Sequence, residues 1–442
     1  MFYDKIATSF SKKIGQKKVV RDSSPNSVEL QKIRKDYMQE QVSKKVSHLN
    51  DLLGLDLKHI NTLSYPPDQL KGNIENYIGL AQVPIGLIGP LSIDGKNASG
   101  DFYVPLATTE GALISTYDFG AKLLKFSDPI KTEIISNVIH ISPMFPFKDE
   151  EEYMKIHDFV EKNYDKIKKI AEEDSRHTTL LSIEHTIVAD NYILKFKYNT
   201  ADAHGLNMIN HATFKACEYI KSEIDMDFYH RSHFSGVKHH SPMNEKEGYG
   251  RHVKASVTIS KKALKMLGIT ARQLKEFCDR CIACGNAAGI NSINVHAANA
   301  IAAIYIATGQ DPADVSSSHV CRFKVELVNF AQEIYWEMDL PNLLVATVGG
   351  GTGLRTQREC LEIMGCYGAK KADKLAEIIA ATILSGEFTT AAAVINKTYV
   401  EAHNNYGRND KVKEIIKVDI KPANDCKKTG KIVKIKTPSS GQ

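Results

Sequence analysis

The sequence predicts an α+β protein with a large domain around a long central buried helix, an inserted small ferredoxin-like domain and an N-terminal helical arm. Three observations lead to this prediction. An apolar run without a fully charged side chain lies between Cys281 and Gln310. Between residues 130 and 224, strand and helix patterns follow in the order strand–helix–strand–strand–helix. A polar segment with helical periodicity precedes residue 73.

The run from Cys281 to Gln310 is the predicted central helix. If it is helical throughout, it extends about 45 Å, which is enough to cross a whole domain. A membrane span is the competing interpretation, because such a span needs about 20 mostly apolar residues. The four asparagines and His296 of this run would each need a partner in lipid, where polar groups are costly. We therefore favour a helix buried in a soluble domain.

Asp311 and Pro312 follow this run directly. Because proline cannot continue a helical ladder, the helix is expected to end here, with the carboxylate facing an interior site. Asp311 is thus a candidate functional residue, and an ordinary surface turn in GQDP is the alternative.

The predicted small domain has a strand over Thr132–Ile141, a charged helix over Lys148–Glu173 and two strands over Thr178–Val188 and Tyr192–Tyr198. A further helix ends near Ile224. This order is typical of a ferredoxin-like sandwich. The last helix opens with the turn DAHGLNMI, and the free N–H groups of a helix N-terminus suit an anion or a nucleotide.

In the predicted large domain, a strand over Gly100–Leu106 leads into a helix over 112–126. Thr108 or Thr109 is expected to cap this helix. Glu110 then lies in its first turn, at a strand-to-helix junction that positions catalytic groups well. A glutamate stabilised by the helix dipole is the alternative.

After the central run, paired strands are expected over 320–328 and 331–338, and a third strand over 343–348. That third strand enters a loop of glycines, which lets a backbone approach a phosphate closely. The loop lacks the Lys-Ser/Thr of a P-loop and the spacing of a dinucleotide fingerprint. Two alanine-rich helices follow, over 369–385 and 389–404, and His403 lies at the end of the second.

Composition narrows the class of protein. Hydrophobic residues make up 43% and charged residues 25% of the 442 residues, which is typical of a soluble globular protein of two or three domains. The net charge is +5, and no basic stripe is interleaved with aromatic residues, so nucleic-acid binding is not expected. The eight cysteines are scattered and no apolar leader is present, so we expect reduced thiols in the cytoplasm.

Two groups of side chains have types that metals prefer. Cys278, Cys281 and Cys284 have a C-x-x-C-x-x-C spacing that can hold an iron–sulfur cluster, although a fourth ligand is usual. We favour the interpretation that these cysteines are three small buried residues on a helix. Zinc bound by loop histidines is conceivable, but their spacing fits no metal pattern, and no metal is predicted. These histidines are His230, His233, His239 and His240.

Six segments appear in an order that resembles one enzyme family, over roughly Glu75 to Arg408. The chain is similar to the hydroxymethylglutaryl-CoA reductases, and most similar to the class shared by archaea and eukaryotes. The animal enzymes' membrane anchor is absent, so the resemblance implies a soluble enzyme. The segments are ENYIG, PIGLIGPL, LATTEGAL, DAHGLNMI, INVHAANAIAAIYIATGQD and ATVGGGT.

The family uses a tetrad of glutamate, lysine, aspartate and histidine, and the resemblance assigns these roles to Glu110, Lys238, Asp311 and His403. It implies NADPH-dependent reduction of hydroxymethylglutaryl-CoA to mevalonate by way of a hemithioacetal and an aldehyde. Lysine would stabilise the oxyanion, glutamate would supply a proton, aspartate would tune both, and histidine would protonate the CoA thiolate.

The resemblance also implies binding residues and a homodimer, or a higher oligomer, whose active site is shared between subunits. Cofactor contacts are expected from Asp202, Gly205, Asn207, Met208, Gly349, Gly350 and Gly351, and 2′-phosphate contacts from Ser175 and Arg176. Substrate contacts are expected from Glu75, Asn76, His296 and Asn299.

Four departures from the family pattern concern the groups that hold the acyl carboxylate. Val237 and His239 flank Lys238, where the family has an aspartate and a second lysine. Phe119 and Asp279 stand where the family has an arginine and a lysine. An arginine that the family has near the position of Val138 is missing. A carboxylate prefers arginine or an ammonium, so Arg231, His239 or His240 would have to compensate. Two alternatives therefore remain open: the same reductase chemistry on another acyl-CoA, or a non-catalytic relative that binds CoA or a nucleotide.

The resulting domain prediction has five parts. They are an N-terminal arm (1–73), a large CoA- and substrate-binding domain (74–137 and 241–408), an inserted NADPH-binding domain (138–228), an interdomain loop (229–240) and a mobile tail (409–442).

Overall fold

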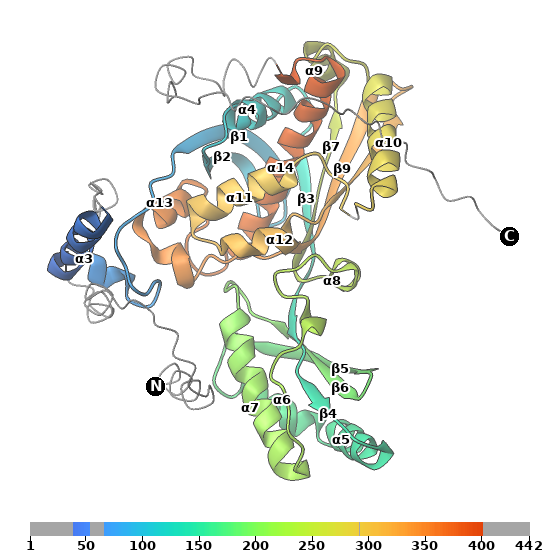
Figure 1. Ribbon diagram of the computed structural model, residues 1–442. Helices are drawn as coiled ribbons and strands as arrows, with labels where there is room; N and C mark the ends of the chain where they lie inside the picture. The colour runs from blue at the N-terminus through green and yellow to red at the C-terminus, as the bar shows by residue number, and fades with distance from the viewer. Residues whose placement is uncertain (1–38, 54–65, 291, 401–442) are drawn as a thin grey trace, which may run out of the picture.

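The computed structural model describes residues 39–53, 66–290 and 292–400, which form two packed units, and one long strand runs from the first unit into the second (Figure 1). The larger unit is a mixed sheet in the order β2-β1-β3-β7-β9-β8, covered by helices. Its strands are β1 (Ile85–Gly95), β2 (Ser99–Ala107), β3 (Ile130–Ile141), β7 (Gly250–Ile259), β8 (Arg322–Val328) and β9 (Glu333–Leu343).

The helices of the larger unit pack on this sheet and enclose one large apolar core. They are α4 (Leu113–Leu124), α9 (Lys261–Met266), α10 (Ala271–Ala287), α11 (Ala297–Thr308), α12 (Val315–Ser318), α13 (Arg355–Ile363) and α14 (Ala372–Ile395). Apart from these, α3 (Gln39–Leu53) lies beside the large unit in Figure 1 and falls inside the helical arm expected there.

The predicted central helix over Cys281–Gln310 is wrong, because the structure divides this run into α10 and α11. Gly289 ends α10 with a left-handed φ of 74°, and the Ile290 N–H donates to the Gly285 carbonyl oxygen at 2.9 Å. This is the usual glycine termination of a helix. The resulting turn, and not a continuous helix, places His296 at the start of α11.

The helix buried most completely is α14, which replaces the two helices predicted over 369–385 and 389–404. It runs unbroken through Gly386, where a Cβ atom would lie 2.3 Å from the ring of Tyr117. Glycine is therefore needed there for close packing and does not break the helix. Among the described helices, α14 alone is long and apolar enough to cross a membrane, but 83% of that stretch is buried inside the protein.

The smaller unit has a separate apolar core between a sheet and three helices. Strand β3 leaves the large sheet and pairs at its end with β6, which also pairs with β4 and β5. The strands agree with the prediction, but the single helix expected over 148–173 is two, which meet at Asn163. The elements are β4 (Met144–Pro146), α5 (Glu150–Lys162), α6 (Tyr164–Glu172), β5 (Thr179–Val188), β6 (Asn191–Asn199) and α7 (Leu206–Ile224).

Buried Arg251 fastens the two units to each other. Its guanidinium donates to Asp373 at 2.7 Å, to the Val345 carbonyl oxygen at 3.2 Å and to the Ala201 carbonyl oxygen at 2.6 Å. Since a buried charge is tolerated only when it is paired and hydrogen-bonded, these contacts hold the first residues of α14, the loop after β9 and the turn before α7 together.

Two local predictions in the large unit are wrong. Helix α4 begins at Leu113, and no side chain caps it. Glu110 lies in the turn before it, where its N–H donates to the Thr108 hydroxyl at 3.0 Å. The third strand expected over 343–348 does not form, because β9 already extends to Leu343 and the following residues run as a loop.

Candidate active site

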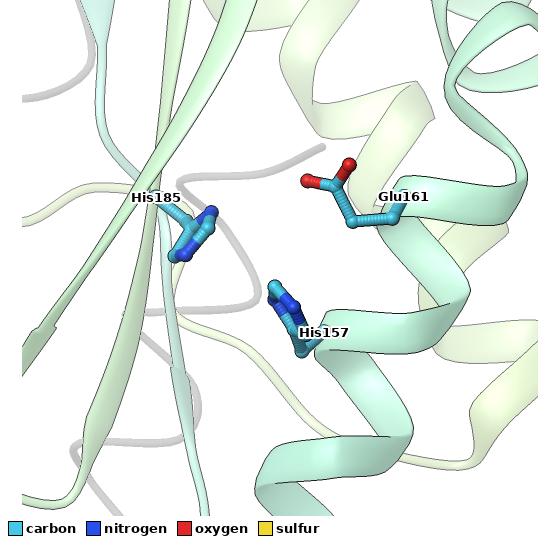
Figure 2. Close-up of side chains that lie close together, drawn as sticks. All are labelled: His157, Glu161 and His185. Carbon is cyan, nitrogen blue, oxygen red and sulfur yellow. The ribbon is translucent and has the colours of Figure 1, made fainter.

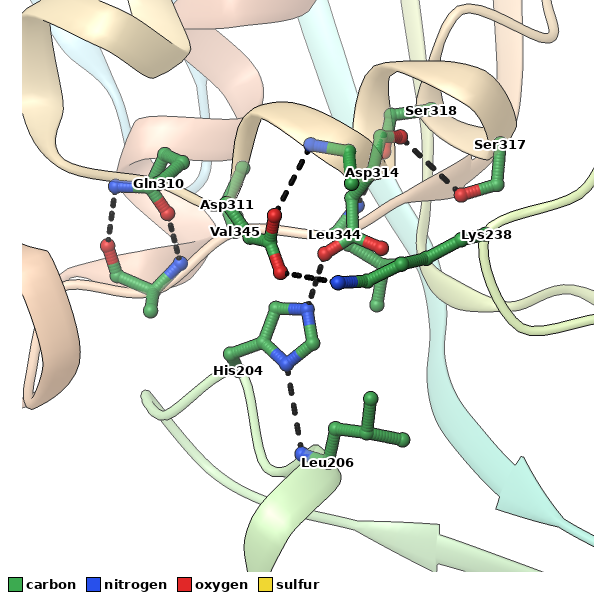
Figure 3. Close-up of polar contacts among 12 residues, drawn as sticks. His204, Leu206, Lys238, Gln310, Asp311, Asp314, Ser317, Ser318, Leu344 and Val345 are labelled. Carbon is green, nitrogen blue, oxygen red and sulfur yellow. Dashed lines mark hydrogen bonds and ion pairs between the residues drawn. The ribbon is translucent and has the colours of Figure 1, made fainter. Parts of the chain in front are cut away.

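Lys238 and Asp311 form an ion pair at the junction of the two units (Figure 3). Lys238 Nζ lies 2.6 Å from Asp311 Oδ2, while Asp311 Oδ1 accepts the Ala313 N–H at 3.0 Å. Both side chains remain about two-fifths exposed, at 38% and 40%. Partial burial alone would raise the pKa of Asp311, but the Lys238 ammonium and the Ala313 N–H lower it below its ordinary value. The pair is therefore charged and accessible.

His204 and Asp314 support this pair from below. His204 Nδ1 accepts the Leu206 N–H at 3.4 Å, so Nε2 carries the proton towards Asp314 Oδ2 at 2.5 Å. Asp314 is buried. The sequence prediction missed this contact, because DAHG was interpreted only as a helix opening.

Gln310 anchors the loop that carries Asp311. Its side-chain oxygen accepts the Ala346 N–H at 2.7 Å, and its Nε2 donates to the Ala346 carbonyl oxygen at 3.0 Å. Residue 346 lies just before the glycine loop. The buried amide therefore fixes the aspartate loop and the glycine loop relative to each other.

A cavity of about 700 Å³ lies beside the ion pair, between the glycine loop and the start of α7. Gly349 and Gly350 have left-handed φ angles of 80° and 55°, and a Cβ on either would meet no atom within 4 Å. Their surface is therefore open to a ligand. Cavity-lining residues that were predicted to bind the cofactor are Gly205, Asn207, Met208, Gly349, Gly350 and Gly351.

The residues of this cavity fit a nucleotide diphosphate. Helix α7 is long, and its first-turn N–H groups have no acceptor within the helix. Such a terminus attracts anions. Gly351 differs from Gly349 and Gly350, because a Cβ at Gly351 would lie 2.6 Å from the Gly309 carbonyl oxygen. Its small size serves the contact between loops.

Three other predicted cofactor residues lie apart from this cavity lining. The Asp202 carboxylate accepts three backbone N–H groups, those of Lys370, Lys371 and Ala372, at 2.7 to 3.0 Å. It holds the start of α14 and is not free to face a ligand. Ser175 is partly buried and accepts a hydrogen bond from Thr178 at 3.0 Å, and Arg176 beside it is exposed.

Glu110 lies in a second polar group, around the start of α11. Its carboxylate accepts a hydrogen bond from Asn299 Nδ2 at 2.8 Å. His296 is fixed at both ring nitrogens, with the Tyr117 hydroxyl 2.8 Å from Nδ1 and the Thr390 hydroxyl 2.5 Å from Nε2. These residues line a pocket separate from the one beside Lys238. One chain thus brings together Lys238 with Asp311, and Glu110 with Asn299 and His296.

Buried Glu387 fixes the backbone conformation at the start of α11, in the second polar group. Its two carboxylate oxygens accept the N–H groups of Val295 at 2.6 Å and His296 at 2.8 Å. Burial raises the pKa of Glu387 to about 7, although the two N–H groups oppose that rise. Sequence reasoning missed Glu387. The available signal was a charged residue in the middle of an otherwise apolar helix, where a carboxylate needs partners.

The remaining predicted residues are not brought to either group. Glu75 and Asn76 are exposed, and His403 lies outside the described residues. Asp279 pairs with Lys275 at 2.5 Å on the surface of α10. Phe119 is 46% exposed and lines an apolar pocket of about 440 Å³ that adjoins the Glu110 group through shared lining residues.

The cysteine and histidine groups have ordinary partners in the described part of the chain. Cys278 is buried, Cys281 partly buried and Cys284 exposed on α10, so the three thiols do not converge. His230 lies 3.1 Å from Asn210, and His240 lies 3.4 Å from Glu245. Neither group forms a ligand cluster.

Comparison with known proteins supports one family over most of the chain. Residues 41–408 match the family model described as hydroxymethylglutaryl-coenzyme A reductase. The chain is 36% identical over 371 residues to the 3-hydroxy-3-methylglutaryl-coenzyme A reductase of Methanocaldococcus jannaschii, covering 80% of this chain and 90% of that relative. It is 35% identical to the enzyme of the same name from Pyrococcus horikoshii, covering 81% and 90%.

Solved structures agree in fold. The class II 3-hydroxy-3-methylglutaryl-CoA reductase from Streptococcus pneumoniae, bound to NADPH in open conformations, superposes with a TM-score of 0.59. The alignment covers 80% of this chain and 86% of that one at 16% identity.

Proposed function

This chain belongs to the hydroxymethylglutaryl-coenzyme A reductase family, and we infer that it reduces hydroxymethylglutaryl-CoA to mevalonate and CoA. The thioester becomes an alcohol through a hemithioacetal and an aldehyde, and NADPH supplies the two hydrides when bound. The observation that carries this proposal is the charged Lys238–Asp311 pair beside a cavity lined by open glycines.

Lys238 stabilises the negative charge that each reduction places on the carbonyl oxygen. An ammonium aimed at such an oxyanion is among the largest contributions an active site makes. Asp311 is a positioning residue for Lys238, since its second oxygen is fixed by a backbone N–H. The left-handed φ of 59° at Lys238 is a conformation that costs energy in a non-glycine residue, which supports a functional role for this side chain.

Glu110 supplies the proton that the alkoxide takes up, and Asn299 holds its carboxyl group in place. Glu110 is exposed in the single chain, whereas an acid of this kind works best when neutral near pH 7. Enclosure by a second subunit would exclude water from the carboxyl group. His403 follows as the acid that protonates the departing thiolate, as the family resemblance implies.

The active site is completed between two subunits of a homodimer. One subunit contributes Lys238 and Asp311, and the other contributes Glu110, His296 and Asn299. This proposal is supported by the separation of the two groups into different pockets of one chain. Glu75 and Asn76, which are exposed, are then available for CoA and the subunit interface.

NADPH occupies the cavity between the glycine loop and α7, with its diphosphate at the first turn of α7 and its 2′-phosphate near Ser175 and Arg176. The smaller unit, an inserted ferredoxin-like domain over 138–228, carries most of these contacts. Residues 74–137 and 241–408 form the CoA- and substrate-binding domain, with residues 229–240 as the loop between them. We place the protein in the cytoplasm.

A second candidate, the same chemistry on another acyl-CoA, is favoured by the pocket beside Phe119. Its lining includes Phe119, Met266 and Leu267, and no arginine or lysine side chain. An apolar wall suits an acyl chain without a distal carboxylate better than hydroxymethylglutarate.

NADPH oxidation with a panel of acyl-CoA substrates tests both candidates. Two NADPH consumed per hydroxymethylglutaryl-CoA, with mevalonate formed, is the expected result. No oxidation with that substrate, but turnover of another thioester, would support the second candidate. Tight CoA binding without turnover of any thioester would contradict both and leave a non-catalytic binding protein.

A further inference from the structure

A group of metal-ligating side chains lies in the smaller unit, outside the proposed active site. His157 and Glu161 are one turn apart on α5 and project from the same face towards His185 of β5 (Figure 2). One ligand atom from each side chain lies within 4.8 Å of the other two. Among the described residues, this is the one group of histidine, cysteine, aspartate or glutamate that converges in this way.

The two imidazoles are held in place by aromatic neighbours. The His185 ring stacks on Tyr192 at 5.2 Å with an interplanar angle of 11°, and the His157 ring stacks on Tyr153 at 5.8 Å and 13°. The two histidine rings meet edge to face at 4.9 Å. Their positions are thus set by packing, which is what a preorganised ligand set requires.

Tyr192 orients one of the two ligands. Its hydroxyl lies 3.0 Å from His157 Nδ1. When Nδ1 carries the proton and donates it to the hydroxyl oxygen, Nε2 presents a free lone pair. A ligating histidine commonly uses its second nitrogen in this way.

Within the described part of the chain, neither the His185 nor the Glu161 side chain takes part in a hydrogen bond or an ion pair. Exposed carboxylates often have no such partner, but the Glu161 carboxylate faces two imidazoles. Nearby lysines on the same helices are engaged elsewhere, since Lys162 pairs with Asp158 at 2.9 Å and Lys166 lies over the Tyr219 ring. The carboxylate is therefore available to a cation.

We propose that His157, Glu161 and His185 bind a divalent transition-metal ion of the zinc class. Two imidazoles and one carboxylate form a set that zinc accepts, with water as the fourth ligand. Tetrahedral ligands at about 2.1 Å from zinc lie about 3.4 Å from one another, so ligand atoms now within 4.8 Å would approach by at most about 1.4 Å. Rotation of the exposed Glu161 side chain and small shifts of the two histidine side chains would supply this approach. Bound metal would fasten α5 to β5, and this role is independent of the proposed reductase activity.

The first test measures zinc binding to the chelator-treated full-length chain. We expect one saturable ion per chain and a rise in the midpoint of thermal unfolding, because a ligand that binds only the folded state stabilises it. His185→Ala should weaken binding by about 100-fold or more, since loss of a group behind a ligand already costs 10- to 100-fold. His211→Ala, which removes an exposed histidine of α7 paired with Asp174, is the matched control and should bind as the wild type does.

Cobalt substitution identifies the ligands independently. Co²⁺ should give visible d–d absorption bands that are absent from His185→Ala and from Glu161→Gln, without an intense thiolate charge-transfer band. Equal affinity in the wild type and His185→Ala, no saturable binding, or a thiolate band would each overturn the proposal. None of these results depends on NADPH oxidation, so failure of the proposed function would be seen separately.

Discussion

The two polar groups proposed to share the active site are built in opposite ways. Lys238 and Asp311 lie on loops, are partly exposed, and are held mainly by each other. His296 lies at the start of a helix with both ring nitrogens engaged, above the buried carboxylate of Glu387. The first group presents charge on elements that can adjust, whereas the second is a rigid framework supported by the core.

This difference shows where function can be lost without loss of folding. A loop residue that meets mainly one partner can be removed at little cost to stability, because surface ion pairs contribute about 0 to 1 kcal/mol. A buried residue that fixes two backbone groups cannot be replaced without affecting both stability and geometry. The following predictions separate the two groups by these effects.

The largest effect is expected from Lys238→Ala. We expect kcat to fall by about 1,000-fold or more, because oxyanion stabilisation of this kind is worth roughly 10²–10³ for a single neutral donor. The unfolding midpoint should hardly change. NADPH oxidation and thermal melts measure the two quantities. Lys246→Ala, which removes an exposed lysine of the neighbouring helix α8 (Pro242–Glu247), is the control and should leave kcat unchanged. A Lys238→Ala variant with wild-type turnover would exclude the proposed role.

A smaller effect, measured on stability, is expected from Glu387. Its pKa is raised from 4.5 to about 7 in the folded chain. The folded state then holds a proton that the unfolded state releases, so this group's contribution to stability falls as pH rises from about 4.5 to 7, and is constant above. The total change is about 3 kcal/mol.

Glu387→Gln should remove this dependence. Denaturant unfolding at several pH values measures this dependence. Between pH 5 and 7, the free energy of unfolding should fall less steeply with pH for the variant than for the wild type. Parallel curves for the two proteins would contradict the burial argument.

The smallest effect is expected in the glycine loop. Gly350→Ala places a Cβ on a residue with left-handed φ, which costs about 1–2 kcal/mol and disturbs the surface proposed to face the diphosphate. We expect KM for NADPH to rise about tenfold with little change in kcat. Gly353→Ala is the matched control, because Gly353 has no left-handed φ and its Cβ would meet no atom within 4 Å. Equal KM values for both variants would argue against nucleotide contact at Gly350.

Sequence reasoning succeeded where local pattern decides structure. The strands β2, β3, β5 and β6 lie close to their predicted ranges, and α7 follows its predicted opening turn. It failed at two glycines that have opposite roles. Gly289 ends a helix that was expected to continue, while Gly386 continues a helix that was expected to break.

At the candidate site, too, contacts between segments that are distant in the sequence were not predicted. The residue types of Lys238 and Asp311 could be identified from the sequence with the help of a family resemblance, and the structure brings them together. Asp202 was assigned to the cofactor from its motif, yet its carboxylate holds the start of α14. Glu387 was missed, because the helix was expected to break between residues 385 and 389 and the backbone groups that Glu387 binds, at Val295 and His296, are distant in the sequence.

Sharing of the site between subunits is the central claim, and purified mixed dimers test it most directly. A dimer of one Lys238→Ala chain and one Glu110→Gln chain would contain one intact site of two, and should show about half the wild-type turnover. A dimer of one wild-type chain and one chain carrying both substitutions would contain none, and should be inactive. The reverse pattern, with the first dimer inactive and the second half-active, would place both groups in one subunit and contradict the account.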